Sequence, residues 1–176
     1  MVEIKDHKNE IPRLVEQSRK LDGTEVTAGV HGKDDSFMAM IAQVHEFGVD
    51  IQVTEDMRGW FLAQGFPLSE DTEVIEIPSR PFVRPAADML TRSLDAVVDA
   101  QMENLVFEQA TAFEAASKVA LHMRQQILDH LGKTGPPLSD MTKQMRRGGG
   151  SAQKLQDEGS LRQAVAGKVD GVEVER

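Results

Sequence analysis

The sequence contains no cysteine, and this absence excludes several classes of protein at once. Without thiols the chain can have no disulfide, no thiolate nucleophile and no zinc site built on sulfur. Aromatic residues are also few: they make up 5% of the 176 residues, with one tryptophan and no tyrosine. We therefore expect a core that is packed with aliphatic side chains and methionine.

Long apolar runs and an excess of cations are missing too. No stretch of 18 apolar residues occurs, so no membrane-spanning helix is expected. Residues 1–8 lack the basic start and apolar centre of a signal peptide, which predicts synthesis in the cytoplasm. The net charge is −9 and the pI about 5.0, so we expect no strong attraction of the whole molecule to nucleic acid.

Patterns of catalytic or metal-binding residues are also missing. His45 and Glu46 resemble the start of a zinc-protease helix, but Val49 stands where the second histidine ligand is required. Ser36, Ser69 and Ser79 lack the flanking glycines of a nucleophile elbow, and no glycine-rich stretch leads into the Lys-Ser or Lys-Thr pair of a phosphate loop. We therefore expect no enzyme, no catalytic residues, no metal ion and no other cofactor.

Apolar spacing predicts a mixture of helices and short strands. One helix is expected at 9–21 with Asn9 as its cap, and a second at 36–47 with Ser36 as its cap. A third helix is expected to follow Thr54, which would cap it. Strands are expected at 24–30, at 72–77 and within 161–174. We expect these three strand segments to form one small, mostly antiparallel sheet. The chain is thus predicted to be a single α+β domain, residues 1–176, with a flexible loop around 133–152.

The longest periodic segment lies between Pro85 and Leu131, where no proline or glycine intervenes. As one helix it would measure roughly 65–70 Å. A domain of this size has a diameter of about 30–40 Å. The segment must therefore either break, most readily around 103–111, or project beyond its own domain. In either form this long helix is expected to pack against the sheet.

Two stretches combine apolar residues with charges and turn residues. In the first, 39–48, the apolar positions follow helical spacing, and Gly48 can end the helix in the left-handed conformation. In the second, 75–86, a strand is stopped by Pro78 and Pro81, which have no N–H group to donate to a ladder. We regard these stretches as the part of the chain around which the rest is organised.

The same stretches carry a resemblance to a known family. The pattern IAxxHEFG at 41–48, followed by IPxRPFxRPA at 77–86, is similar to the virion morphogenesis or tail-completion proteins of tailed phages and prophages. A proline-rich turn at 136–142 and the segment 155–162 resemble the C-terminal part of that family, so the resemblance extends over about residues 24–169. The chain departs from the family pattern in an insertion-like segment, 51–72, and in the late motif, where relatives have a cleaner PLxDTGxLR.

The resemblance implies a structural role in a phage particle. Proteins of this family are small α+β proteins that act at the head–tail junction or tail end, as tail-completion, neck or tail-terminator proteins. It implies association with itself, with a hexameric ring as one form, and with other head–tail connector and tail-tube proteins. The expected location is the virion, where DNA passes nearby without being tightly bound, and no membrane is involved. The alternative is a nucleic-acid-binding regulator that uses a basic loop with Lys143, Arg146 and Arg147 as contacts.

The second stretch places Phe82 between Arg80 and Arg84, and two interpretations are open. In one, the three residues stabilise their own chain, with Phe82 in the core and the arginines at helix ends or paired with acidic neighbours. In the other they form a subunit interface together with Glu46 and Phe47, because arginine and aromatic residues are enriched at interface hot spots. In that case the arginines would bind carboxylates of the adjacent subunit.

Overall fold

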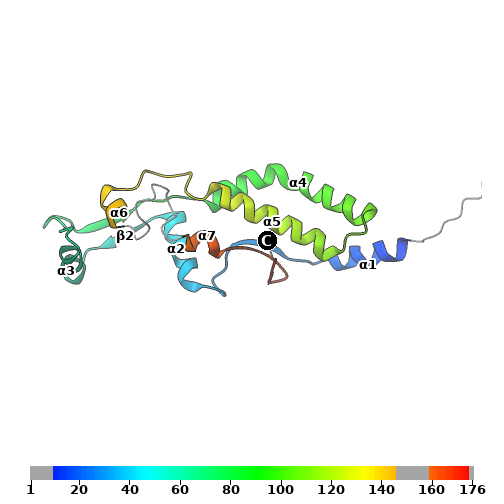
Figure 1. The fold of residues 1–176 in the computed structure, drawn as a ribbon, viewed down its shortest axis with the longest axis horizontal. Coiled ribbons are helices and arrows are strands. Elements are labelled where there is room, and N and C mark those ends of the chain that lie inside the picture. The colour runs from blue at the N-terminus through cyan, green and yellow to red at the C-terminus, as the bar shows by residue number, and fades with distance from the viewer. Residues whose placement is uncertain (1–9, 146–158, 175–176) are drawn as a thin grey trace, which may run out of the picture. The chain divides into compact units, whose positions relative to one another are not determined.

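The computed structural model describes residues 10–145 and 159–174 and shows an α+β chain, as the sequence predicted (Figure 1). Helices predominate, and the strands of the described ranges form one three-stranded and one two-stranded sheet. In chain order the elements are α1 (Ile11–Leu21), β1 (Val26–Val30), α2 (Ser36–Phe47), β2 (Val49–Gln52), α3 (Glu55–Ala63), β3 (Val74–Ile77), α4 (Val83–Phe107), α5 (Ala112–His130), α6 (Asp140–Met145), α7 (Ser160–Ala164), β4 (Val165–Val169) and β5 (Val172–Glu173).

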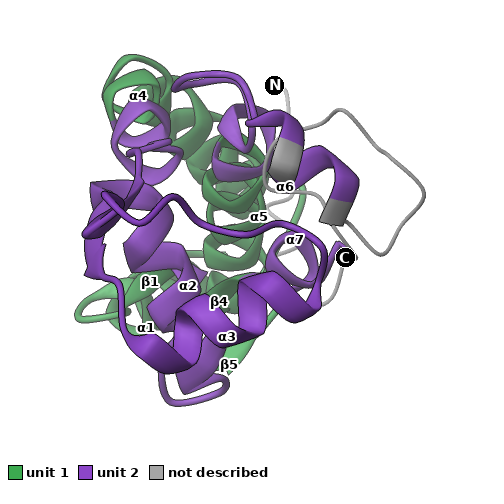
Figure 2. Ribbon diagram, turned by 90° about the vertical axis from the view of Figure 1, so that its left-hand side faces the viewer, with its two compact units in different colours: residues 1–28, 88–126, 166–176 green, residues 29–87, 127–165 purple. Residues whose placement is uncertain are grey.

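The contacts within the chain divide it into two compact units, which Figure 2 shows in different colours. Unit 1 consists of residues 1–28, 88–126 and 166–176, and unit 2 of residues 29–87 and 127–165. Each unit is therefore assembled from segments that lie far apart in the sequence. The single domain expected from the sequence stays a prediction, and the two units are described one at a time.

In unit 1 the long periodic segment is broken, within the range that its length predicted. Helix α4 ends at Phe107 and α5 begins at Ala112, so the two helices form a hairpin. Helix α1 braces the turn: the Arg13 guanidinium donates to the carbonyl oxygens of Leu105 at 2.8 Å and Ala110 at 3.4 Å. Gln17 accepts a hydrogen bond from the Ala112 N–H group at 2.7 Å, which satisfies a donor at the start of α5.

The sequence also carries a local signal for this break. Thr111 and Glu114 form a capping box, in which the Glu114 carboxylate accepts from the Thr111 N–H group at 2.7 Å and the Thr111 hydroxyl accepts from the Glu114 N–H group at 3.2 Å. Two N–H groups at the start of α5 are satisfied in this way. The chain is thus set to begin a new helix here.

The core of unit 1 lies where α5 meets the three-stranded sheet, whose strand order is β1-β4-β5. Ala116, Ala120 and Val169 are buried together there. The approach is close, because a Cβ atom on Gly167 would lie 2.7 Å from the carbonyl oxygen of Ala120. Small side chains on both sides therefore set the distance between helix and sheet.

The second sheet, in unit 2, corrects the predicted strand pairing. We expected segment 72–77 to join the sheet formed by 24–30 and 161–174. Instead β3 pairs with β2 in an antiparallel ladder in which Val49 faces Ile77 and Ile51 faces Ile75. The physical reason is proximity in the chain, since β2 and β3 flank α3 and close on each other as a hairpin, at a smaller cost in loop entropy than a distant pairing. We refer to residues 49–77, which contain β2, α3 and β3, as the arm.

Two of the three predicted caps can be compared with the structure. Thr54 caps α3 as expected, because its hydroxyl accepts from the Met57 N–H group at 3.2 Å. The cap of α2 is Asp35 and not Ser36: the Asp35 carboxylate accepts from the Met38 N–H group at 2.9 Å. A carboxylate one residue earlier satisfies the same donors and adds a favourable interaction with the helix dipole. Asn9 lies outside the described residues.

Candidate functional site

The two stretches singled out in the sequence meet in unit 2, where the end of α2 contacts the start of α4. The Glu46 carboxylate accepts hydrogen bonds from the N–H groups of Phe82 at 2.8 Å, Val83 at 3.0 Å and Arg84 at 3.0 Å. These are N–H groups that a helix start leaves without partners inside the helix. The next residue, Pro85, has no N–H group at all. Every donor at the start of α4 is thereby accounted for.

The reverse contacts satisfy the end of α2. The Arg80 N–H group donates to the carbonyl oxygen of His45 at 2.6 Å, and the Arg84 guanidinium donates to the carbonyl oxygen of Glu46 at 3.0 Å. Gly48 then turns the chain with φ +75°, and a Cβ atom there would lie 2.9 Å from the carbonyl oxygen of Ile77. Only glycine combines this conformation with this space. We call the reciprocal arrangement of residues 45–48 and 80–84 the junction.

Arg80 is buried although no carboxylate among the described residues forms an ion pair with it. Its guanidinium donates instead to the carbonyl oxygens of Pro136 at 3.3 Å, Pro78 at 3.4 Å and Pro137 at 3.4 Å. Gly135 makes room for the side chain, since a Cβ atom there would lie 2.6 Å from Cγ of Arg80. The proline-rich turn is thus held on the junction by Arg80.

The junction also contains the most completely buried large side chain of the described chain, Phe82, which is 0% exposed. The Thr134 hydroxyl donates to the carbonyl oxygen of Pro81, next to it. A buried aromatic ring of this size contributes a large part of the hydrophobic stabilisation around it. Phe82 therefore anchors the start of α4 in the core of unit 2.

The electrostatics of the junction favour an ionised glutamate and a neutral histidine. Burial raises the pKa of Glu46, but the hydrogen bonds from the N–H groups of Val83, Phe82 and Arg84 and from the Arg84 side chain outweigh it, and the pKa lies below its ordinary value. Burial lowers the pKa of His45, and the charge of Arg80 lowers it further. The carboxylate charge is therefore retained where the helix start needs it.

The structure divides the five residues of the predicted subunit interface into two groups. Arg80, Phe82 and Glu46 lie in the interior, which favours the interpretation in which they stabilise their own chain. Arg84 and Phe47 remain at the surface: the Arg84 side chain is 62% exposed, Phe47 is 67% exposed, and the guanidinium carbon lies 5.3 Å from the centre of the phenyl ring. For these two residues a role between subunits stays a prediction.

The predicted contact loop is described only in part. Lys143 lies on α6 and forms an ion pair with Asp140 at 2.8 Å. Arg146 and Arg147 lie outside the described residues. The earlier part of the predicted flexible loop contains α6 and the prolines whose carbonyl oxygens hold Arg80. Its structural role in the junction was not visible in the sequence, because the donor that it satisfies stands more than 50 positions earlier.

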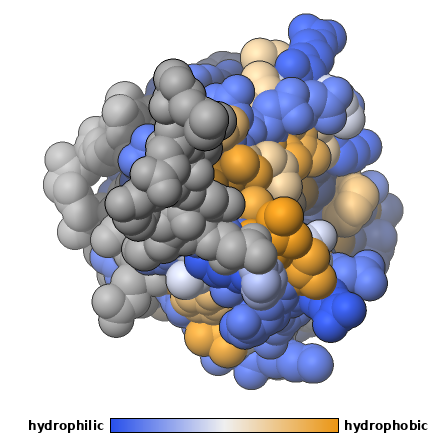
Figure 3. All heavy atoms as spheres, turned by 90° about the vertical axis from the view of Figure 1, so that its right-hand side faces the viewer, coloured by the Kyte–Doolittle hydropathy of each residue, from blue (hydrophilic) through white to orange (hydrophobic). Residues whose placement is uncertain are grey.

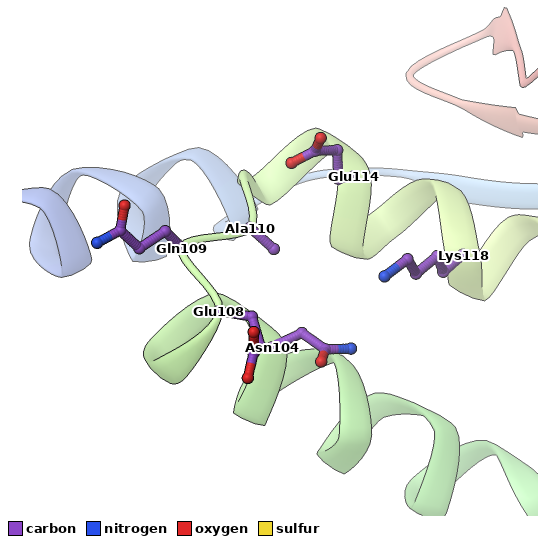
Figure 4. A pocket seen from close by; sticks show the side chains of 6 residues that line it. All are labelled: Asn104, Glu108, Gln109, Ala110, Glu114 and Lys118. Atoms are coloured by element: carbon purple, nitrogen blue, oxygen red, sulfur yellow. The ribbon is translucent and has the colours of Figure 1, made fainter.

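A depression of about 300 Å³ lies at the turn between α4 and α5 and is lined by Asn104, Glu108, Gln109, Ala110, Glu114 and Lys118 (Figure 4). Of its charged side chains, Glu108 follows the end of α4, Glu114 and Lys118 lie on α5, and Glu114 is already used in the capping box. No group of three or more histidine, aspartate or glutamate residues in the described chain is placed to hold a metal ion. No described helix is long and apolar enough to cross a membrane.

Sequence reasoning missed the exposed apolar side chains. In unit 2 these include Phe37 and Met40 on α2, and Trp60 and Leu62 on α3. In unit 1 Phe107 and Phe113 are exposed near the hairpin turn, and Figure 3, which faces this end of the chain, shows hydrophobic atoms gathered there. Helical spacing alone assigns such residues to a core, so the available signal was only that α2 and α3 carry more apolar positions than one buried face requires.

Comparison with protein-family models, with curated proteins and with solved structures finds no match to this chain.

Proposed function

We propose that this protein is a structural component of a tailed-phage particle, which acts at the head–tail junction or the tail end and assembles through contacts between subunits. The observation that carries the proposal is the junction. The patterns IAxxHEFG and IPxRPFxRPA, on which the resemblance to the tail-completion family rests, form one reciprocal structure in which almost every residue of the pattern has a physical role. Residues with such linked roles support a shared fold more strongly than two independent short patterns.

The surface of the chain supports the proposed role as a protein that assembles with others. Exposed apolar side chains occur on both units, and several of them are aromatic: Phe37, Phe47, Trp60, Phe107 and Phe113. Aromatic side chains are enriched where proteins bind one another. In the proposed role these side chains contact further copies of the chain and the connector and tail-tube proteins of the particle.

The acidic surface fits a location near DNA that must move. With a net charge of −9, a ring of such subunits repels the phosphate backbone. The nucleic-acid-binding alternative relies on a basic loop, and its one described cation, Lys143, is paired with Asp140. We therefore favour the particle role, and an electrophoretic mobility shift assay separates the two. Tight duplex binding at physiological salt, with a steep salt dependence, supports the alternative.

The direct test is genetic and uses a phage or prophage that encodes the chain. Deletion of the gene should leave heads and tails unjoined, or tails of abnormal length, in electron micrographs, and a plasmid copy of the gene should restore joined particles. Mass spectrometry of purified wild-type particles should detect the protein. Infectious particles of normal form after deletion, together with absence of the protein from wild-type particles, would overturn the proposal.

A further inference from the structure

We infer that the arm of one copy docks on the exposed face of helix α2 of a second copy, so that copies join head to tail. The α2 face is formed by Phe37, Met40 and Phe47. The inference rests on the proposed function in one respect: it supplies the subunit contact that an assembling particle protein needs. The structure describes the arm completely.

The arm has almost no interior of its own. None of its side chains is buried, and α3 contributes no buried residue. A two-stranded hairpin and a helix of this length are marginal on their own in water. Yet the arm is internally braced, because the Arg58 guanidinium donates to the carbonyl oxygens of Ser69 at 2.9 Å and Thr72 at 2.6 Å. It is thus a preformed element that keeps several of its apolar side chains exposed among the described residues.

Two of those side chains are large: Trp60 is 52% exposed and Leu62 is 65% exposed. Val49 and Val74 on the two strands are exposed as well. Several large exposed apolar side chains on one element favour a surface that another protein covers.

The charge of the arm indicates what kind of protein surface covers it. Residues 49–77 contain seven acidic side chains and one cationic side chain. All seven acidic side chains are exposed: Asp50, Glu55, Asp56, Glu70, Asp71, Glu73 and Glu76. The cation is Arg58, which already binds backbone carbonyl groups. Asp50 and Glu76 stand directly opposite each other in the ladder. Like charges at such a position destabilise a hairpin, and a cation from a second molecule between them removes that cost.

The α2 face offers the complementary surface. Its three side chains fall within one side of the helix by their spacing, and all three are exposed. Arg84 lies over Phe47, and exposed Lys33 and Arg162 stand in the loop before α2 and on α7, which packs against α2. Outside the arm, the described part of unit 2 has six lysines and arginines and five acidic residues. The arm thus carries a net charge of −6, from one cation and seven acidic residues, and the rest of the described unit 2, which includes Asp34 and Asp35 beside Lys33, carries +1.

Such a contact is heterologous, because it joins two different surfaces. Repeated from copy to copy it closes into a ring if the rotation allows, and otherwise continues as a filament. It also predicts that assembly weakens as salt rises, since salt screens attraction between exposed charges.

The test uses sedimentation velocity of the full chain over a range of protein concentrations, between about 50 mM and about 500 mM salt. The arm variant is Asp50→Lys with Glu76→Lys, which keeps like charges opposite each other but reverses their sign. The face variant is Phe37→Ser with Met40→Ser. The matched control is Glu103→Lys with Glu108→Lys, which makes the same change in net charge on exposed positions of unit 1.

We expect the wild-type chain to assemble, the arm and face variants to raise the dissociation constant by about tenfold or more, and the control to change it by less than about twofold. Mixing the arm variant with the face variant leaves one intact pair of surfaces, so the mixture should stop at a dimer. Circular dichroism must show that each variant is folded, which the exposure of the replaced side chains favours.

Three results would overturn the inference: a wild-type chain that stays monomeric at the highest soluble concentration, an arm variant that assembles as well as the control, or a mixture that forms no dimer. The proposed function fails by a different readout. If sedimentation behaves as expected but the protein is absent from phage particles, the contact stands and the particle role does not. If the protein is found in particles but the arm variant assembles normally, the reverse holds.

Discussion

Replacing Glu46 with alanine should destabilise the protein by about 3–5 kcal/mol, because it leaves several N–H groups at the start of α4 without an acceptor in a largely buried place. The same change removes the acceptor for the Arg84 guanidinium, which lies 3.1 Å from the carboxylate. Glu46→Gln keeps the shape and one oxygen acceptor but removes the charge, so we expect a smaller loss, about 1–2 kcal/mol. Glu73→Ala, at an exposed position of the same unit, serves as control and should stay within about 0.5 kcal/mol of wild type.

The measurement is urea unfolding followed by circular dichroism, with equal slopes required before the midpoints are compared. The reasoning about the junction is refuted if Glu46→Ala unfolds at the same urea concentration as Glu73→Ala. It is also refuted if Glu46→Gln costs as much as Glu46→Ala, because the loss would then come from the charge alone and not from the acceptors.

The pH dependence of the free energy of unfolding provides a second test of the junction, because the direction of the effect is known. The pKa of Glu46 is lower in the folded chain than its ordinary value. Its contribution to stability is therefore fully present above the ordinary pKa of a glutamate and is lost as the pH falls through the lowered pKa of the folded state. As the pH falls from neutral through the acid range, the wild-type chain should lose more stability than Glu46→Gln, and the difference in stability between the two should narrow.

Three further predictions follow from other contacts. Arg80→Ala should cost about 1–3 kcal/mol, because it leaves the carbonyl groups of the proline-rich turn without their donor, and urea unfolding would show this; an unchanged midpoint would mean that water replaces the guanidinium fully. Gly167→Ala should lower the free energy of unfolding by about 1–3 kcal/mol in the same assay, because the added methyl group clashes with Ala120. Gly59→Ala has open space around it on α3, so it should leave stability unchanged or raise it by about 0.5–1 kcal/mol. The free protein should bind duplex DNA weakly at physiological salt in a mobility shift assay, and a tight complex would contradict the acidic-surface argument.

Local signals in the sequence gave most of the helices correctly. The expected range for the break in the long helix was right, since a continuous helix would be too long for the domain and Thr111 and Glu114 supply a new helix start. Thr54 was recognised as a cap because its hydroxyl precedes two acidic residues. Such signals depend on residues within one helical turn, and propensity and capping rules address that range.

The contacts that the sequence did not reveal join residues far apart in the chain. Glu46 was expected to contribute to a subunit interface, and it is buried because it caps a helix that starts almost 40 positions later. Arg80 was expected at a helix end, paired with an acidic neighbour or between subunits, and its actual partners are carbonyl oxygens of prolines that no charge pattern identifies. The pairing of β3 with β2 was missed for the same reason: strand periodicity gives the face of a strand but not its neighbour.

The junction has a consequence for how this chain can vary. Because Gly48 and the segment around Ile77 touch there, the arm begins and ends at nearly one point within unit 2. The hydrogen bonds that join α2 to α4 are made by residues outside the arm. The 29 residues of the arm can therefore be shortened, lengthened or exchanged without removing these hydrogen bonds. The arm is thus a segment that can be replaced as a unit, which agrees with its insertion-like sequence. A chain with the arm replaced by a short Gly-Ser turn should still fold around Phe82, and arms from other proteins could be grafted at the same two ends to change what the scaffold binds.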